Sequence, residues 1–200
     1  QMARAARACL QDNFCGGVVV TKYGHVKGEI ANVACFEGGH PVPDENSLRG
    51  TDAALALTED LTESDTVVFL LSGGGSALFE KPLLPLAELQ DVTNQLLAAG
   101  ADIVEINTIR KRLSAVKGGR FARHCAPAQV FAVVLSDILG DPLDMIASGP
   151  AYPDSSSCAQ ALDIAKRYGL RLSERAWALL AQETPKTLEN VETQITGSVR

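Results

Sequence analysis

The chain has 200 residues, of which 46% are hydrophobic, and this is enough apolar material for one substantial folded core. Its 24 acidic and 18 basic residues give a net charge of −6, which argues against general binding to nucleic acid or to an acidic membrane surface. No uninterrupted apolar stretch approaches the roughly 18 residues that a membrane-spanning helix requires.

The first part of the chain predicts a helix, two strands and a second helix. The amino-terminal segment QMARAARACLQ lacks the apolar core and cleavage site of a signal peptide and has the apolar spacing of an amphipathic helix. The expected elements are a helix at 1–12, strands at 18–21 and 30–36, and a helix at 48–60.

Five scattered cysteines form no C-x-x-C pair, which fits reduced thiols with buried packing roles in the cytoplasm better than a disulfide frame or a zinc site. They are Cys9, Cys15, Cys35, Cys125 and Cys158.

A restricted turn precedes the helix expected at 48–60. In the segment EGGHPVPDENS, His40 stands between a glycine and a proline, which limits the backbone conformations of the turn. His40 is either a site residue held by a stiff loop or a histidine that only hydrogen-bonds the backbone of its turn. Asn46 or Ser47 is expected to cap the helix that follows.

The central feature is a strand followed by a glycine-rich loop. Residues 66–71, TVVFLL, are all apolar or β-branched, as in a parallel strand covered on both faces. The loop that follows consists of Ser72, Gly73, Gly74, Gly75 and Ser76. Glycines let a ligand approach main-chain N–H groups closely. Open α/β sheets bind ligands at the carboxyl ends of their strands, and a cluster of N–H groups there favours an anion. The loop is neither a P-loop nor a dinucleotide fingerprint, and a tight turn that needs small residues is the alternative.

A basic segment follows a helix expected at 86–99. Residues 101–124 hold six of the 18 lysines and arginines. On a helix, one polar face comprises Asn107, Arg110, Lys111 and Ser114. The side expected to be buried comprises Ile103, Ile106, Ile109 and Leu113. Together with Lys117, the polar face suits one small polyanion, and a solvated basic face is the alternative.

A second buried strand, QVFAVVL at 129–135, is followed by Ser136 and Asp137. A carboxylate at the tip of a parallel strand can hold Mg²⁺ or accept a proton from an attacking hydroxyl. Asp137 is the preferred candidate, Asp141 and Asp144 are further candidates, and helix capping is their alternative role. The remaining expected elements are helices at 155–168 and 173–182, capped at Ser173, and a strand from 191.

Three long motifs, in this order and spacing, resemble the glycerate 2-kinases of the class that carries a MOFRL-type C-terminal domain. The motifs are LLSGGGSAL, EINTIRKRLSAVKGGRFA and LSDILGDPLDMIASGPAYPD. The segment EGGHPVPDENS is similar to that family's motif upstream of the glycine loop, and the resemblance covers essentially the whole chain. It implies an α/β fold, a Rossmann-like three-layer domain with a mostly parallel central sheet flanked by helices.

The resemblance also implies an activity, a site and a domain organisation. Such enzymes phosphorylate the 2-hydroxyl of D-glycerate with ATP and Mg²⁺, in the cleft between two domains. The residues expected to be catalytic are Asp137, Arg110 and Lys117, with Asp137 and Asp141 as metal ligands. Those expected to bind substrate or phosphate are Ser72, Gly73, Gly74, Gly75, Ser76 and Asn107.

The family has a Gly-Lys pair upstream of the first helix and further motifs in a second domain, and neither is found within residues 1–200. We therefore expect the chain to be an N-terminal domain, truncated at both ends and inactive without the C-terminal domain. The resemblance leaves open a homodimer, the nucleotide preference, and which loop binds glycerate and which ATP.

Two other functions compete with the kinase. A hydroxypyruvate reductase would need a dinucleotide fingerprint with an acidic ribose contact, and neither follows any expected strand. A non-catalytic domain that captures a small acid with the same loops is the third hypothesis.

Overall fold

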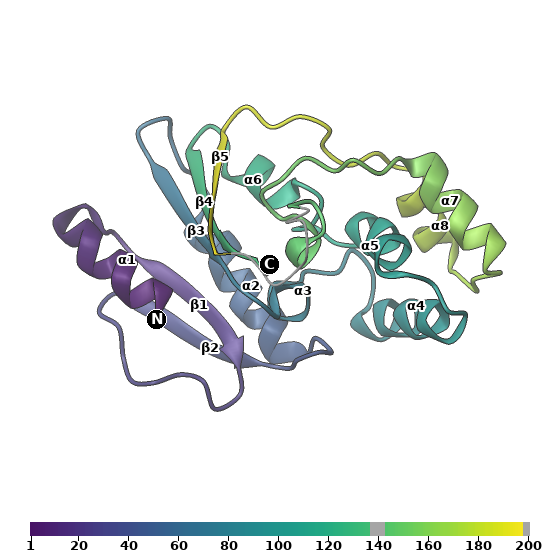
Figure 1. Ribbon diagram of the computed structural model, residues 1–200, viewed down its shortest axis with the longest axis horizontal. Coiled ribbons are helices and arrows are strands. Elements are labelled where there is room, and N and C mark those ends of the chain that lie inside the picture. The colour runs from purple at the N-terminus through teal and green to yellow at the C-terminus, as the bar shows by residue number, and fades with distance from the viewer. Residues whose placement is uncertain (137–142, 198–200) are drawn as a thin grey trace.

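The structure is a computed structural model that describes residues 1–136 and 143–197 (Figure 1). Parallel strands are interspersed with helices along the chain, which confirms the α/β class predicted from the sequence. The elements are α1 (Met2–Leu10), η1 (Gln11–Asn13), β1 (Gly17–Lys22), β2 (Val33–Gly38), α2 (Glu45–Leu57), β3 (Thr66–Leu71), α3 (Gly75–Leu78), α4 (Leu86–Ala98), α5 (Ile103–Arg112), α6 (Arg120–Cys125), β4 (Gln129–Leu135), η2 (Ile146–Ser148), α7 (Cys158–Arg167), α8 (Glu174–Leu180) and β5 (Val191–Gly197). In this part of the chain, no helix combines the length and apolar character needed to cross a bilayer.

The strands form two parallel groups. β1 pairs with β2, and β4 lies between β3 and β5. The parallel pairing agrees with the sequence, although the described strands fall into two hydrogen-bonded groups and not into one central sheet. Leu71 is in register with Val134, so β3 and β4 end side by side. The glycine loop and Ser136 therefore leave the same edge of the sheet, as predicted.

One face of the β3–β4–β5 group packs on an aromatic cluster. Phe69 of β3, Phe79 and Phe121 of α6 have ring centroids 5.0 to 5.5 Å apart. Val130 and Ala132 of β4 belong to the same buried cluster. This packing fixes β3, and thus the start of the glycine loop, against the helices.

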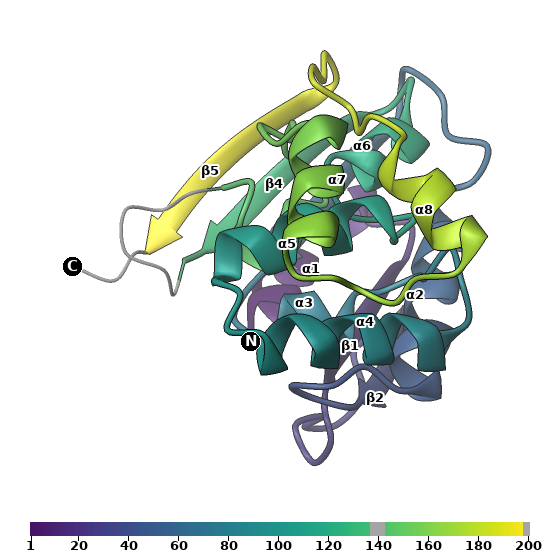
Figure 2. The ribbon, with the colours of Figure 1, turned by 90° about the vertical axis from the view of Figure 1, so that its right-hand side faces the viewer.

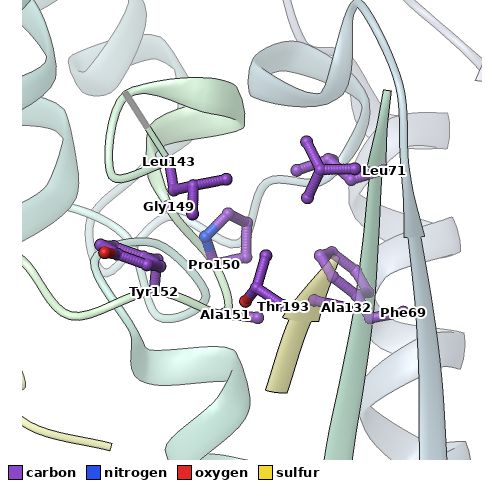
Figure 3. A pocket seen from close by; sticks show the side chains of 10 residues that line it. Phe69, Leu71, Ala132, Leu143, Gly149, Pro150, Ala151, Tyr152 and Thr193 are labelled. Atoms are coloured by element: carbon purple, nitrogen blue, oxygen red, sulfur yellow. The ribbon is translucent and has the colours of Figure 1, made fainter. Parts of the chain in front are cut away.

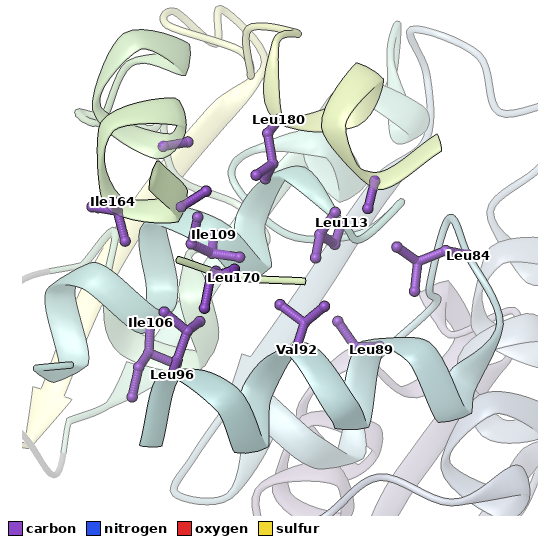
Figure 4. Packing of buried hydrophobic residues seen from close by; sticks show 13 residues of the cluster. Leu84, Leu89, Val92, Leu96, Ile106, Ile109, Leu113, Ile164, Leu170 and Leu180 are labelled. Atoms are coloured by element: carbon purple, nitrogen blue, oxygen red, sulfur yellow. The ribbon is translucent and has the colours of Figure 1, made fainter. Parts of the chain in front are cut away.

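A second core lies among the helices beside the sheets, where α4, α5, α7 and α8 pack together (Figures 2 and 4). Ile106, Ile109 and Leu113 point into it, as the helical spacing predicts. The prediction for Ile103 was wrong, because this residue is in the first turn of α5 and is 62% exposed.

Side-chain caps set the helix boundaries. Asp44 is the N-cap of α2, with its Oδ1 accepting from the backbone N–H of Ser47 at 2.9 Å, so the prediction of Asn46 or Ser47 as the cap was wrong. Ser157 caps α7 and Ser173 caps α8.

All five cysteines are free thiols, but their burial differs. Cys125 is buried, and burial raises the pKa of its thiol to about 11 although a hydrogen bond to Thr58 lowers it. Cys9 and Cys15 are exposed, so the packing role predicted for every cysteine does not hold for these two.

Candidate functional site

The glycine loop turns sharply at the carboxyl end of β3. Ser72 and Gly73 are exposed, whereas Gly74 has φ 90° and is the N-cap of the short helix α3. A Cβ on Gly75 would lie 2.7 Å from the Cβ of Ala147 and 2.8 Å from Leu71 Cδ1. Gly74 is thus required by its backbone conformation and Gly75 by packing. The close-packed turn that the sequence left as an alternative is present, with its first residues open to solvent.

The basic residues meet the far end of this loop. Arg110 Nη2 donates to the carbonyl of Ser76 at 2.9 Å, and Lys117 Nζ donates to the same carbonyl at 2.9 Å. Glu80 lies between the two cations, 3.1 Å from Arg110 and 3.6 Å from Lys117. The structure therefore brings three of the predicted site residues, Ser76, Arg110 and Lys117, together around Glu80, a carboxylate that the sequence analysis did not single out.

Lys117 is enclosed by protein. Its side chain has no exposed surface, and its Nζ also donates to the carbonyls of Phe79 at 3.1 Å and Ala147 at 3.4 Å. Burial lowers the pKa of Lys117 to about 8, with Glu80 raising it and Arg110 lowering it further. The ammonium joins the glycine loop to the segment around Ala147. Arg110 keeps 13% of its side chain exposed.

The segment around Ala147 has an unusual backbone. Ala147 (φ 51°), Ser148 (φ 61°) and Gly149 (φ 62°) are consecutive residues in the left-handed region, a conformation that costs energy for residues other than glycine. The backbone N–H of Gly118 donates to Ser148, and that of Gly119 to Gly149. This left-handed turn (147–149) is thus fixed to the end of the basic segment.

Asn107 supports the same turn. Its Oδ1 accepts a hydrogen bond from Ser148 Oγ at 2.8 Å, and its Nδ2 donates to Met145 Sδ at 3.6 Å. Asn107 is 3% exposed. The structure therefore connects it to the glycine loop through the left-handed turn.

A second ion cluster is buried beneath α5. Lys111 Nζ lies 3.0 Å from Asp154 and 3.2 Å from Asp144, and Arg112 lies 3.6 Å from Asp154. Burial would raise the pKa of Asp154, but the hydrogen bond from Thr184, the charge of Lys111 and further hydrogen bonds outweigh it and hold this pKa at about 2. The solvated basic face considered as an alternative is wrong, because Lys111, Arg112 and Lys117 have fully buried side chains.

The predicted metal ligands Asp137 and Asp141 lie outside the described residues. Among the residues that are described, no three His, Cys, Asp or Glu side chains form a metal-binding group. Asp144 is already engaged, since it pairs with Lys111 and accepts from Ser155 Oγ at 2.6 Å. Magnesium binding by Asp137 and Asp141 stays a prediction.

A small cavity lies between the sheet and the segment after the left-handed turn (Figure 3). Its lining residues are Phe69, Leu71, Ala132, Val134, Leu143, Gly149, Pro150, Ala151, Tyr152 and Thr193. None of these side chains is charged, so the cavity suits apolar packing and not a phosphate group.

Sequence reasoning missed Glu80 and Asp154, which neutralise the buried cations. Each is a lone acidic residue close to an apolar or proline-containing segment. This surrounding sequence was the signal that the acidic side chain could be buried. Their partners lie far along the chain, so the pairing itself had no local signature.

The fold places the protein among the open α/β proteins, whose ligands generally bind at the carboxyl ends of parallel strands. The family described as "Domain of unknown function (DUF4147)" matches residues 1–181, and the chain belongs to this family.

The chain is also similar to proteins with a named activity. The chain is 54% identical to a D-glycerate 2-kinase of Thermotoga maritima over 100% of this chain and 48% of the relative. It is 42% identical to an Agrobacterium vitis protein provisionally named a hydroxypyruvate reductase, over 100% of this chain and 45% of the relative. A crystal structure of a glycerate kinase from Thermotoga maritima superposes with a TM-score of 0.95 and 55% identity, covering 98% of this chain and 48% of that one. The chain spans about half the length of the curated relatives it matches.

Proposed function

We propose that the complete protein is a kinase that transfers the γ-phosphoryl group of ATP to the 2-hydroxyl of D-glycerate. The observation that carries the proposal is the similarity of the whole chain to D-glycerate 2-kinase from Thermotoga maritima. We further propose that residues 1–200 form a Rossmann-like N-terminal domain that works with a C-terminal domain of the same polypeptide and is inactive alone. A homodimer is compatible with this proposal, as is a cytoplasmic location, which the free thiols support.

Phosphoryl transfer depends mainly on positioning and on neutralising charge, and the site offers groups for both. The N–H groups of the loop from Ser72 to Ser76 would face an anionic oxygen of phosphate or carboxylate. Arg110 would add positive charge, since 13% of its side chain is exposed and it lies against the loop at Ser76. In the transfer, the 2-oxygen would form a bond to the γ-phosphorus while the bond from that phosphorus to the ADP oxygen breaks and ADP leaves. The hydroxyl proton would pass to a base, for which Asp137 is the candidate.

The remaining predicted residues take supporting or metal roles in this proposal. Lys117 and Asn107 would hold the glycine loop against the left-handed turn, because their polar atoms contact protein groups. Asp137 would bind Mg²⁺ or accept the hydroxyl proton, with Asp141 as a second metal ligand. When bound, Mg²⁺ would neutralise charge on the ATP phosphates.

The test is an assay of the complete protein with ATP, Mg²⁺ and D-glycerate, following ADP release and identifying the product by phosphorus NMR. ADP release with formation of 2-phosphoglycerate supports the proposal. Formation of 3-phosphoglycerate would support kinase activity but would overturn the proposal that the 2-hydroxyl is the acceptor.

The name of the Agrobacterium vitis relative favours the reductase as a second candidate. Oxidation of NADH or NADPH with hydroxypyruvate, without ADP release from glycerate, would establish it in place of the kinase. Calorimetric binding of glycerate without turnover under any nucleotide would instead favour a non-catalytic binding domain.

A further inference from the structure

His40 lies against the glycine loop. A Cβ built on Gly74 would be 3.0 Å from His40 Cδ2 and 3.2 Å from His40 Nε2. The edge of the imidazole that carries Nε2 therefore occupies the space where any other residue at position 74 would place its side chain. The sequence predicted a restricted turn around His40 but gave no reason to bring it to this loop.

The turn that carries His40 is anchored on several sides. Asp44 accepts hydrogen bonds from the hydroxyl of Tyr23 at 2.6 Å and from the backbone of Ser47 at 2.9 Å. Gln90 of α4 donates to the carbonyl of Pro43 at 3.1 Å. A Cβ on Gly38 would lie 2.5 Å from Ser47 Oγ, so the turn also packs tightly on α2. Its neighbours therefore fix the position of His40, although the residue itself is exposed.

The imidazole has unused hydrogen-bonding capacity. Within residues 1–136 and 143–197, no hydrogen bond or ion pair involves the His40 ring, whose two nitrogens can donate and accept. By contrast, His124 of α6 has its Nε2 3.1 Å from the carbonyl of Leu55. The ring of His124 thus contacts the protein backbone. His40 is an exposed residue in a tightly anchored turn, and its ring lies beside the glycine loop.

We propose that His40 contacts the substrate held at the glycine loop, with Nε2 hydrogen-bonded to an anionic oxygen. This inference rests on the proposed function, and it assigns a residue to the site from a loop upstream of β3. The oxygen belongs either to the carboxylate of glycerate or to a phosphate of ATP.

The test compares variants of the complete protein in the glycerate and ATP assay. His40→Ala should raise KM for one of the two substrates about tenfold or more, since it removes a hydrogen bond to a charged group. His40→Gln, whose amide can reach the position of Nε2, should retain more affinity than His40→Asn. A rise for glycerate identifies the carboxylate, and a rise for ATP identifies the phosphate. Calorimetric affinities for each substrate should change in parallel.

Two controls separate contact from damage to the fold. His124→Gln, in α6, and Val42→Ala, in the same turn as His40, should leave both KM values unchanged. Unchanged KM values for both substrates in His40→Ala overturn the inference, whatever happens to kcat. An inactive wild-type protein would instead refute the proposed function, so the two failures are distinguishable.

Discussion

Lys111 and Asp154 form an ion pair 3.0 Å apart, and neither side chain has any exposed surface. Asp154 also accepts a hydrogen bond from Thr184 Oγ1 at 2.6 Å and from the backbone of Ser156 at 2.9 Å. The pair thereby joins α5 to two later segments of the chain.

Replacing Asp154 should destabilise the fold strongly. Asp154→Asn leaves the Lys111 charge buried with weaker compensation, so the free energy of unfolding should fall by about 3–5 kcal/mol. Asp163→Asn, at an exposed ion pair with Arg167, should cost less than about 1 kcal/mol. Urea unfolding measures the free energy of unfolding of both variants. Equal decreases in the two variants would show that the buried pair contributes no more than the exposed pair.

Stability should fall steeply in acid. The carboxyl of Asp154 has a pKa of about 2 in the folded protein, against 3.8 for an unperturbed aspartate. The unfolded chain therefore takes up the proton first, so this contribution is present above pH 4 and is lost as the pH falls from about 4 to 2. Unfolding free energies measured across that window should depend less on pH in Asp154→Asn than in the wild type.

Arg110→Ala should slow the proposed kinase reaction of the complete protein. If Arg110 contacts charge that develops in the transition state, its loss should lower kcat about a hundredfold, equivalent to about 3 kcal/mol. Arg167→Ala, at a half-exposed arginine of α7, is the control for removing a surface cation. Normal kcat and KM in Arg110→Ala would remove this residue from the mechanism.

Gly74 and Gly100 form a matched pair for testing the loop. Both have positive φ, 90° and 77°, but a Cβ on Gly100 meets nothing within 4 Å, whereas one on Gly74 meets His40. Gly100→Ala should therefore cost only the left-handed backbone strain, about 1–2 kcal/mol. Gly74→Ala should cost more and also reduce activity. Thermal unfolding and the kinase assay check the two effects, and full activity in Gly74→Ala would contradict the prediction.

Lys117 and Glu80 should be energetically coupled. Lys117→Met leaves Glu80 with Arg110 as its cation, and Glu80→Gln leaves the buried Lys117 without this carboxylate. Each single variant therefore weakens the same contact, and the double variant should be more stable than the sum of the single losses predicts. The interaction energy in a double-mutant cycle should be about 0.5–3 kcal/mol. Additive losses would mean that the contact seen at 3.6 Å contributes little.

The sequence predicted the parts of the fold that local patterns control. The bounds of β3 and β4 agree with the apolar runs at 66–71 and 129–135, because buried parallel strands have a continuous apolar signature. Asp44 was missed as a cap because Asn46 and Ser47 are equally good capping residues close by. Local patterns could not predict which acidic residue pairs with Lys117, or that His40 lies against Gly74. Both contacts depend on how distant segments of the chain pack together.

Arg110 and Lys117 both bind the main-chain oxygen at Ser76, and the hydroxyl takes no part in either contact. These two contacts beneath the loop therefore do not depend on the side-chain hydroxyl at position 76. A library of variants at this one codon could sample substrate preference by directed evolution while the cationic support stays in place.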